Sequence, residues 1–600
     1  MACAYVLPGV RTDLQVNLAG ATMRGSQVEF RVWAPAAPRV WLKLWRGGAA
    51  EPQEIALRRL GSADFGMPDL AEDTDMDTWV VVTEAAPGDL YQYTIQDRSI
   101  PDPVSRYLPE GVHGRTAIVD PDAFQWTDRD WRGMPLRDFV IYELHVGTFT
   151  PAGTFDSAIE KLDYLRDLGI TAIEVMPVNA FPGKHNWGYD GVGLYAVQES
   201  YGGPEAFKRF VDEAHRRGLA VLLDVVYNHL GNEGNYLSLF GPYFTSKHRT
   251  PWGDAVNYDD EGCEGVRRFI VDNALYWLRE YHLDGLRLDA VQTIKDDSDF
   301  HIVAEIAGRA YELARELGRT IVVTAETDEN DAKYVRPREQ GGYGADAVWS
   351  DDFHHAVHAM LTGERAGYYQ DFGDPRLLTR TLNEGYAFQG EHFNFWKDNR
   401  GTPAADVPLP TNIICIQNHD QVGNRAKGER LTVLVPRGAR KALAAILLLA
   451  PHTPLLFMGQ EYDEAAPFQF FTDYGDATLQ KAVSEGRRNE FAGFDFSEVP
   501  DPQDRPTFER SRLTWKIDDD MLEWYRALLR LRREIVVESP RACRAEWIDD
   551  RTLNMHIPAD KPRLLLHAAF GGELGSHPGA GWNQVLESNE DGYLVRVYRS

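Results

Sequence analysis

The chain has 600 residues, of which 43% are hydrophobic and 26% are charged, and its formal net charge is −28. This composition is that of a folded globular protein and excludes collagen-like and disordered chains. So negative a surface repels nucleic acid and anionic lipid, so neither is an expected partner, whereas a neutral ligand such as a sugar is compatible with it.

The first part of the chain, residues 1–110, predicts a small β-sandwich domain. Turn residues separate short stretches that alternate apolar and polar side chains, a pattern typical of half-buried strands. These stretches are 28–33, 40–45, 79–83 and 91–95. Three prolines, Pro101, Pro103 and Pro109, then mark an extended connection.

From about residue 138 strands and helices alternate, as in the helical patterns 155–168 and 302–317. Eight such units predict an α/β fold with a parallel sheet, and their number favours a closed (β/α)8 TIM barrel over residues 111–540. Periodicity alone does not distinguish closure from an open sheet. A small C-terminal β domain, residues 541–600, is expected to follow. The predicted barrel strands are 140–146, 170–175, 219–226, 283–288, 321–324, 346–349, 413–416 and 454–457.

Three long connections follow the third, sixth and eighth predicted strands, at 228–262, 350–410 and 459–519. Connections of this length inside a compact domain are usually functional. Because barrel enzymes build their sites at the carboxyl ends of the strands, we expect the site at the end where these connections lie.

Cysteine usage and the absence of targeting patterns bear on location. Four cysteines, Cys3, Cys263, Cys415 and Cys543, have neither metal-ligand nor redox spacing. The N-terminus lacks a charged start followed by a long apolar run, and the longest apolar stretch, 442–451, is too short to cross a bilayer. We therefore expect a cytoplasmic protein without a signal peptide or a membrane span.

Polar side chains follow several predicted strands at their carboxyl ends. One such side chain alone is usually a helix cap or a loop hydrogen-bonding group. Because the strand ends of a barrel converge on one mouth, their coincidence at four strands indicates a shared site. The residues concerned are Asp224, His229, Arg287, Asp289, Glu326, His419 and Asp420.

Two carboxylates are what glycoside cleavage needs, one ionised and one protonated. Arg287 precedes Asp289 by two residues and so shares its strand face, where a fixed cation holds Asp289 ionised. The apolar run before Glu326 predicts a raised pKa for this group. Asp420 could bind substrate hydroxyls, and His229 and His419 could donate hydrogen bonds to the same ring.

A catalytic metal is the competing interpretation. Asp224, His229, Asp289, His419 and Asp420 are possible ligands. However, the sequence has no HxH or HExxH spacing there, and Arg287 beside Asp289 opposes a cation. We therefore expect no catalytic metal, although a structural ion in a loop is compatible with the sequence.

Four of these segments, DVVYNH, GLRLDAV, the glutamate after TA, and QNHD, resemble the signature regions of the α-amylase superfamily of glycosidases. The resemblance implies that Asp289 is the nucleophile, Glu326 the general acid/base and Asp420 the transition-state stabiliser. It makes Arg287, His229, His419 and Asp224 supporting residues, and Tyr189 an aromatic platform under the glucose being cleaved. It implies no cofactor.

Longer stretches, among them MPVNAFPGKHNWGYDGVGLYA and TPWGDAVNYDDEG, are similar to a retaining member of this superfamily that cleaves the α-1,4 bond between a maltooligosaccharide and a terminal trehalose. Where many members carry Lys-His after the nucleophile, this chain has Gln292-Thr293, which suits a different leaving group. Trp252 and the aromatics in 468–471 are candidates for that side, and loop packing is an equally good interpretation of them.

Two other functions are compatible with the same residues. One is a glucan branching enzyme, which passes the glycosyl group to another glucan. The other is a non-catalytic glucan-binding protein on the same fold, since a fold alone does not distinguish enzymes from binding proteins. The expected partner in every case is an α-glucan, bound by a monomer or a homodimer.

Overall fold

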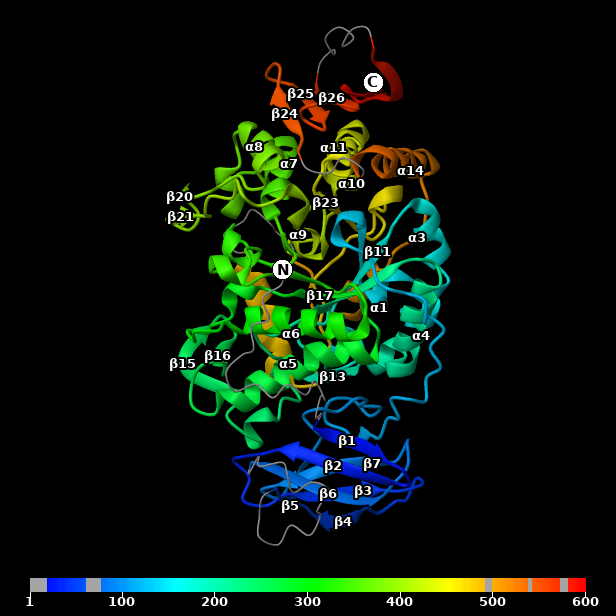
Figure 1. Cartoon of the computed structure of the whole chain (residues 1–600), viewed down its shortest axis with the longest axis vertical. Coiled ribbons are helices and arrows are strands. Elements are labelled where there is room, and N and C mark those ends of the chain that lie inside the picture. The colour runs from blue at the N-terminus through cyan, green and yellow to red at the C-terminus, as the bar shows by residue number, and fades with distance from the viewer. Residues whose placement is uncertain (1–18, 61–76, 492–498, 538–541, 572–580) are drawn as a thin grey trace.

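The computed structural model describes residues 19–60, 77–491, 499–537, 542–571 and 581–600. Figure 1 shows three tiers along the long axis: an N-terminal pair of sheets, a central barrel, and a C-terminal sheet at the far end. The predicted α/β architecture with a β domain at each end is therefore confirmed. Cys3 lies outside the described residues.

The N-terminal tier consists of two antiparallel sheets with strand orders β1-β2-β6-β5 and β4-β3-β7-β8, with β9 paired to β7. Phe30 and Tyr91 come from different sheets, and their rings meet edge to face with centroids 5.0 Å apart, which places the core between the sheets. The strands are β1 Gly20–Arg24, β2 Gln27–Trp33, β3 Trp41–Trp45, β4 Gln53–Ala56, β5 Arg58–Arg59, β6 Thr78–Glu84, β7 Leu90–Ile95, β8 Arg98–Ile100 and β9 Thr116–Ala117.

The central tier is a closed barrel of eight parallel strands, in which β10 pairs with β23 to complete the ring. Closure, which periodicity alone left open, is thus settled. The first barrel strand is shorter than the predicted range 140–146, because residues 146–149 form helix α1. The barrel strands are β10 Ile141–Leu144, β11 Ala172–Val175, β14 Ala220–Val225, β17 Gly285–Leu288, β18 Val322–Glu326, β19 Ala347–Trp349, β22 Asn412–Cys415 and β23 Thr453–Phe457.

Helices surround the barrel. The single helix predicted over 155–168 is wrong: it divides into α2 and α3, because the Lys161 N–H bonds to the carbonyl of Ala158, three residues back, and tightens the turn. Gly169 ends α3 at φ 111°, a conformation that glycine tolerates. The helices are α1 Val146–Phe149, α2 Phe155–Ile159, α3 Leu162–Leu168, α4 Gly203–His215, α5 Cys263–Glu280, α6 Ile302–Leu317, α7 Asp351–Thr362, α8 Arg376–Glu384, α9 His419–Gly423, α10 Leu431–Leu434, α11 Arg437–Leu449, α12 Ala477–Glu490, α13 Arg505–Arg510 and α14 Asp519–Leu531.

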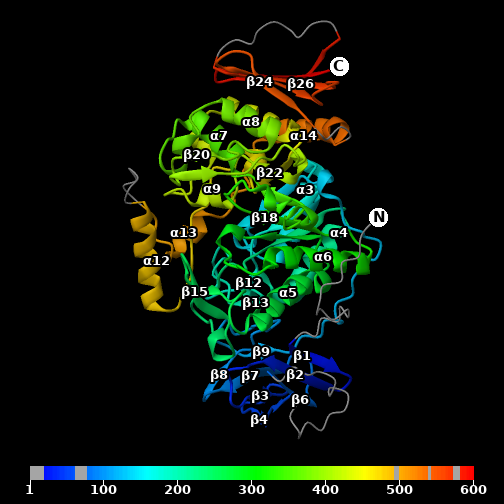
Figure 2. The same cartoon turned by 60° about the vertical axis from the view of Figure 1, so that its left-hand side comes forward.

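The three long connections carry structure of their own. The first contains the hairpin of β15 (Phe244–Thr250) and β16 (Gly253–Val256), and the second contains α7, α8 and the hairpin of β20 (Glu391–Phe393) and β21 (Asp398–Arg400). The third contains α12, which Figure 2 shows at the outer edge of the barrel tier. A two-stranded pair, β12 (Asn179–Ala180) and β13 (Gly193–Val197), extends the connection after β11.

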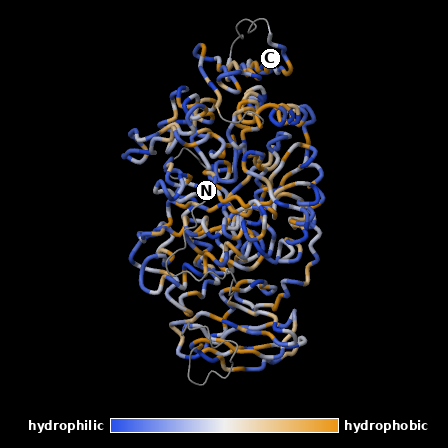
Figure 3. The backbone as a smooth tube through the Cα atoms, in the orientation of Figure 1, coloured by the Kyte–Doolittle hydropathy of each residue, from blue (hydrophilic) through white to orange (hydrophobic). Residues whose placement is uncertain are grey.

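The barrel interior is layered. A buried apolar layer of inward-facing side chains, including Ile141, Leu222, Val322, Ile413 and Leu455, fills the lower part. Figure 3 shows that apolar segments run through the middle of the barrel tier, whereas many outer loops are hydrophilic. Because strand side chains alternate, positions two residues further along these strands face inward again, above the apolar layer. At those positions β10 and β14 carry Glu143 and Asp224, and Arg287 of β17 lies level with Asp224 in the strand register.

The C-terminal tier is a five-stranded antiparallel sheet with the order β24-β25-β26-β28-β27. Helix α11 packs against it on one side and against α14 on another, which connects the sheet to the barrel. In the described part of the chain no helix is long and apolar enough to span a membrane. The strands are β24 Arg544–Trp547, β25 Thr552–Ile557, β26 Leu564–Phe570, β27 Asn583–Glu590 and β28 Tyr593–Arg599.

Candidate active site

Four barrel strands bring the predicted carboxylates to one mouth. In the strand register Asp224 of β14 lies opposite Arg287 of β17, which lies opposite Thr324 of β18. Asp289 follows β17 and Glu326 ends β18, so each lies two residues nearer the carboxyl end than Arg287 and Thr324 do. Alternation within each strand therefore directs all of these side chains into the barrel.

Arg287 is the hub of the site and is almost fully buried, with 2% of its side chain exposed. Its Nη1 lies 2.7 Å from Asp224 Oδ2 and 2.7 Å from Asp289 Oδ1, and its Nη2 lies 3.6 Å from Glu326 Oε2. Trp349 supports the guanidinium, whose Cζ is 4.4 Å from the ring centroid. One cation thus serves three carboxylates, which leaves the site short of positive charge.

Asp289 is held by two different donors. Besides the ion pair with Arg287 through Oδ1, it accepts a hydrogen bond at Oδ2 from Asn228 Nδ2, at 2.7 Å. Asn228 also donates to the Asp289 carbonyl at 2.8 Å. These contacts fix the orientation of the carboxylate.

Glu326 has the opposite environment. Burial, and then the nearby charge of Asp289, raise the pKa of Glu326 well above its ordinary value, although Arg287 opposes the shift. Its Oε2 accepts a hydrogen bond from the backbone N–H of Ala290. The prediction that this glutamate has a raised pKa is confirmed, and the cause is burial in the barrel mouth.

Tyr189 and His419 form a second polar group beside Arg287. The Tyr189 hydroxyl donates to Asp224 Oδ2 at 2.7 Å and lies 2.8 Å from His419 Nε2. Glu143, at the end of β10, binds both the backbone N–H and the Nδ1 of His419. Burial acts to lower the pKa of His419, but the Glu143 carboxylate outweighs it and raises that pKa.

His229 and Trp252 lie together at the edge of the site. The two rings are stacked with centroids 4.1 Å apart and an interplanar angle of 6°. His229 Nε2 is 3.0 Å from the Tyr189 carbonyl, which ties the pair to the Tyr189 segment. Trp252, near the tip of the β15–β16 hairpin, is 46% exposed and so offers a free aromatic surface.

A cavity of about 200 Å³ opens beside Glu326 and Asp420. Asp420 is oriented by Asn424, whose Nδ2 donates to Oδ1 at 2.5 Å. Burial, and then the charge of Asp420, raise the pKa of Asp351 in the same wall to about 7. The remaining wall combines polar groups with aromatic rings: Gln292, Asp328, His355, Tyr368, Phe393, Phe395, Trp396, Arg400, Gln421 and Asn424.

The aromatics of segment 468–471 separate into two environments. Phe468 and Phe471 are fully buried, and Phe468 stacks on Trp187 at 5.1 Å. Phe470 is only partly buried and lies against the guanidinium of Arg487. None of the three lines the cavity beside Glu326. For Phe468 and Phe471 the structure therefore supports the loop-packing interpretation.

Several site residues were missed by sequence reasoning. Glu143, Asn228, Asp351 and Arg400 all contact or line the site. Glu143 offered a signal, since a charged residue within a strand buried on both faces needs a partner. Arg400 offered none, because it lies on the β20–β21 hairpin inside a long connection and not at the end of a barrel strand.

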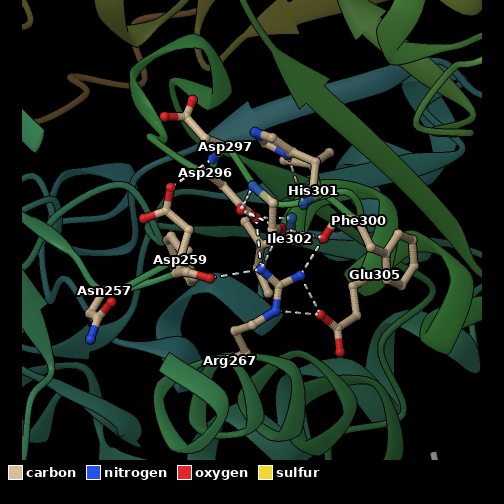
Figure 4. A network of polar contacts seen from close by, with 12 residues as sticks. Asn257, Asp259, Arg267, Asp296, Asp297, Phe300, His301, Ile302 and Glu305 are labelled. Atoms are coloured by element: carbon tan, nitrogen blue, oxygen red, sulfur yellow. Dashed lines mark hydrogen bonds and ion pairs between the residues drawn. The ribbon is translucent and has the colours of Figure 1, made fainter. Parts of the chain in front are cut away.

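The connection after β17 is anchored by Arg267 of α5. Its Nη1 binds Asp296 Oδ2 at 2.8 Å and the Tyr258 carbonyl at 2.9 Å, and its Nε binds Glu305 Oε2 at 2.9 Å. Figure 4 shows this guanidinium at the centre of the segment from Asp296 to Glu305. The network therefore fixes the connection that begins at the cavity with Gln292.

One group of possible metal ligands lies next to this network, among the residues that the structure describes. It consists of His248, Asp259 and Asp297. Lys247 Nζ already lies 2.9 Å from Asp259 Oδ2, so the protein supplies a cation itself, and Asp297 is exposed. None of the three lines the cavity beside Glu326.

Comparisons with known proteins agree with this geometry. The family model "Alpha amylase, catalytic domain" matches residues 118–249. A solved structure described as a putative alpha amylase from Salmonella typhimurium is similar over 97% of this chain and 99% of its own, with a TM-score of 0.86 and 39% identity. A closed barrel with paired carboxylates at its mouth and these matches define an α-amylase-type glycoside hydrolase.

The curated relatives identify the family more closely. The chain is 46% identical over 508 residues to the malto-oligosyltrehalose trehalohydrolase of Saccharolobus solfataricus, covering 84% of this chain and 85% of that protein. It is 47% identical over 523 residues to the enzyme of the same name from Arthrobacter ramosus, covering 85% and 88%. The chain belongs to the malto-oligosyltrehalose trehalohydrolase family.

Proposed function

We propose that the chain hydrolyses the α-1,4-glucosidic bond next to the terminal trehalose of maltooligosyltrehalose, releasing trehalose and a maltooligosaccharide with retention of configuration. The observation that carries the proposal is the single guanidinium of Arg287 in contact with both Asp289 and Glu326. It joins an oriented, charged carboxylate to a buried carboxyl of raised pKa, the pair that a retaining glycosidase requires.

Asp289 is the proposed nucleophile. Its Oδ1 is paired with Arg287 and its Oδ2 with Asn228, so the charge is fixed in direction before substrate arrives. Attack on the anomeric carbon forms a glycosyl–enzyme bond and breaks the bond to the leaving oxygen. As the negative charge leaves Asp289, Arg287 keeps Asp224 as a partner, so the cation is never left without one.

Glu326 is the proposed general acid and then base. Its raised pKa keeps a proton available for the leaving oxygen, and the deprotonated form then takes a proton from the attacking water. Because Oε2 accepts from the Ala290 N–H, Oε1 is the oxygen that we expect to carry this proton. Asp420, across the cavity, is the proposed stabiliser of the transition state.

The cavity beside Glu326 is the proposed site of the leaving trehalose. It combines aromatic rings with carboxylates and an arginine, as sugar recognition requires. Gln292, one of the residues in place of Lys-His, lines it, and its buried Oε1 has no hydrogen-bond partner in the described part of the chain. A buried acceptor without a partner is costly, and a sugar hydroxyl would satisfy it.

The remaining predicted residues are proposed to bind the glucan on the other side of the scissile bond. Tyr189 and His419 stack on one another at 5.2 Å and present polar edges toward Asp224. His229 and the exposed Trp252 extend this surface outward. This proposal departs from the sequence expectation for Trp252, a candidate for the leaving-group side, because Trp252 stacks on His229 and does not line the cavity beside Glu326. The ring of Trp252 is free to stack on a pyranose face.

Product analysis tests the proposed function. Trehalose should be released rapidly from maltooligosyltrehalose, with slow cleavage of plain maltooligosaccharide of equal length. New α-1,6 branches from amylose, without trehalose release, would instead identify a branching enzyme. Glucan binding without turnover of either substrate would identify a binding protein.

The location and the oligomeric state are proposals as well. We propose a cytoplasmic enzyme, supported by free thiols at Cys263, Cys415 and Cys543, which suit a reducing compartment. A monomer or homodimer is the proposed assembly, and light scattering on the purified chain measures it directly.

A further inference from the structure

A second cavity, of about 420 Å³, lies at the opposite end of the barrel from the carboxylate site. Its walls come from the segment before β10 and from residues just before β17 and β18, hence from the amino ends of these strands. Its volume is in the range of small-molecule sites. The lining residues that matter here are Trp126, Arg129, Arg132, Arg279, His282 and Arg319.

The cavity is rich in guanidinium groups although the chain has a net charge of −28. Arg319 is nine-tenths buried, with 10% of its side chain exposed, and its Nε has no partner among the described residues. The buried Nε of Arg279 has none either. Arg132 donates to two backbone carbonyls, so its charge is not neutralised there.

The acidic groups around the cavity are already occupied. Asp128 Oδ2 is 2.8 Å from both His215 Nδ1 and His282 Nδ1. Asp284 accepts from Trp131 Nε1 at 2.7 Å, from the Val221 N–H at 2.9 Å and from Arg319 Nη2 at 3.1 Å, and it pairs with His215 Nε2 at 2.9 Å. Glu316 pairs with Arg279 at 3.0 Å. Among the residues that the structure describes, Arg129 and Arg132 have no acidic partner, so their positive charge is left over.

An aromatic wall stands beside this charge. Trp126 stacks on His282 with centroids 3.8 Å apart and an interplanar angle of 15°, and Phe124 meets it edge on at 4.9 Å. The indole is thus held in place rather than free to rotate. A rigid ring next to guanidinium donors suits a ligand that has both a ring and an anionic group.

We propose that this cavity binds a small phosphorylated molecule, with its phosphate on the guanidinium groups and its sugar or base ring against Trp126. Arginine is suited to this role because its planar fork binds phosphate oxygens in pairs. The site lies away from the glucan-cleaving residues and does not depend on the proposed function. A sugar phosphate and a nucleotide share this chemistry, and the experiment separates them.

Isothermal titration of the full chain tests the proposal, with glucose 6-phosphate, adenosine monophosphate and inorganic phosphate as probes and maltotetraose as a neutral control. At least one phosphate ester should bind saturably and more tightly than inorganic phosphate. The double variant Arg129→Glu, Arg132→Glu changes two exposed side chains, and it should bind that ester roughly tenfold more weakly or worse. Raised salt should weaken binding in the wild type.

The matched control is Arg505→Glu on α13, a 78% exposed arginine outside the cavity, which should bind as the wild type does. Absence of saturable binding for every ester, or equal binding by the double variant, would overturn the proposal. Equal affinity for inorganic phosphate and the esters would remove the role of the ring and overturn it too. Maltotetraose binding that Trp126→Ala abolishes would identify a glucan site instead.

Discussion

The two ends of strand β17 carry aspartates that differ in their charged partners. Asp284, just before the strand, has Arg319 and His215 as charged partners and two further donors, and these lower its pKa although burial opposes them. At the other end Asp289, Asp224 and Glu326 share the single cation of Arg287. A buried carboxylate that has several donors and cationic partners stays ionised near neutral pH. Buried carboxyl groups that share a single cation can have raised pKa values and can take up or release a proton.

The residues at the Asp284 end stabilise the fold, whereas those at the Asp289 end include the proposed catalytic groups. The Asp284 end holds together Trp131, the Val221 backbone and Arg319, which come from three different segments. At the Asp289 end, burial raises the pKa of Asp224 to about 6 and raises the pKa of Glu326 well above its ordinary value. The following predictions test this division.

The largest expected effect is on catalysis at the Asp289 end. Asp289→Asn keeps the shape of the side chain but removes the proposed nucleophile, so kcat for trehalose release should fall at least ~10⁴-fold. The melting temperature should not fall, because one of the three carboxylates that share Arg287 has been neutralised. Asp254→Asn, in the β15–β16 hairpin, is the control and should keep both properties. A variant with normal turnover would contradict the assignment.

The next effect is on stability at the Asp284 end. Asp284→Asn leaves the buried Arg319 without its counter-charge and removes one of the two carboxylates paired with His215, which keeps Asp128. It should cost about 3 kcal/mol or more in the free energy of unfolding. The folded fraction should retain near-normal kcat. Denaturant unfolding and steady-state kinetics on the same sample measure both. Loss of kcat without loss of stability would break the contrast between the two ends.

The pH dependence of this loss has a definite sign. Because the folded pKa of Asp284 is depressed, its stabilising contribution is present above the ordinary aspartate pKa of about 3.9 and is lost as the pH falls through the folded value. The stability gap between wild type and Asp284→Asn should therefore be widest near neutrality and should shrink in acid. A gap independent of pH would show that the carboxylate charge is not what stabilises this end.

The next prediction concerns the pH dependence of catalysis at the Asp289 end. As the proposed general acid, Glu326 must be protonated, so kcat should fall as the pH rises through its raised pKa, well above the ordinary glutamate value of about 4.3. In Asp289→Asn the like charge beside it is gone, so the pKa of Glu326 should fall. Carbon-13 NMR of the glutamate carboxyls follows this titration. An unchanged pKa would show that the two groups are not coupled.

The smallest effect concerns the leaving-group side. Gln292→Ala removes an acceptor that we expect to bind a trehalose hydroxyl, worth about 1 kcal/mol, so kcat/KM for maltooligosyltrehalose should fall roughly fivefold. The slow cleavage of plain maltooligosaccharide should change less, and Gln292→Asn should recover part of the loss. Equal losses on both substrates would assign Gln292 a structural role only.

Much of this molecule is determined by local sequence. Alternating strand and helix patterns located all eight barrel strands within a few residues, because a strand buried on both faces must be apolar throughout, as in 219–226. The sequence also identifies Asp289 and Glu326 as candidate site residues, because both lie at the carboxyl ends of predicted barrel strands. Two-residue periodicity was enough to place Arg287 on the same face as Asp289.

Other features were decided only by the tertiary structure. Ring closure depends on the pairing of β10 with β23, which are more than 300 residues apart, and no local pattern encodes it. Arg400 reaches the cavity from a distant hairpin, and Glu143 reaches His419 across the barrel mouth. The different charged partners of Asp284 and Asp289 likewise come from the segments that folding brings to each. The sequence states the type of each residue, but the number of hydrogen-bond donors around a carboxylate is known only from the folded structure.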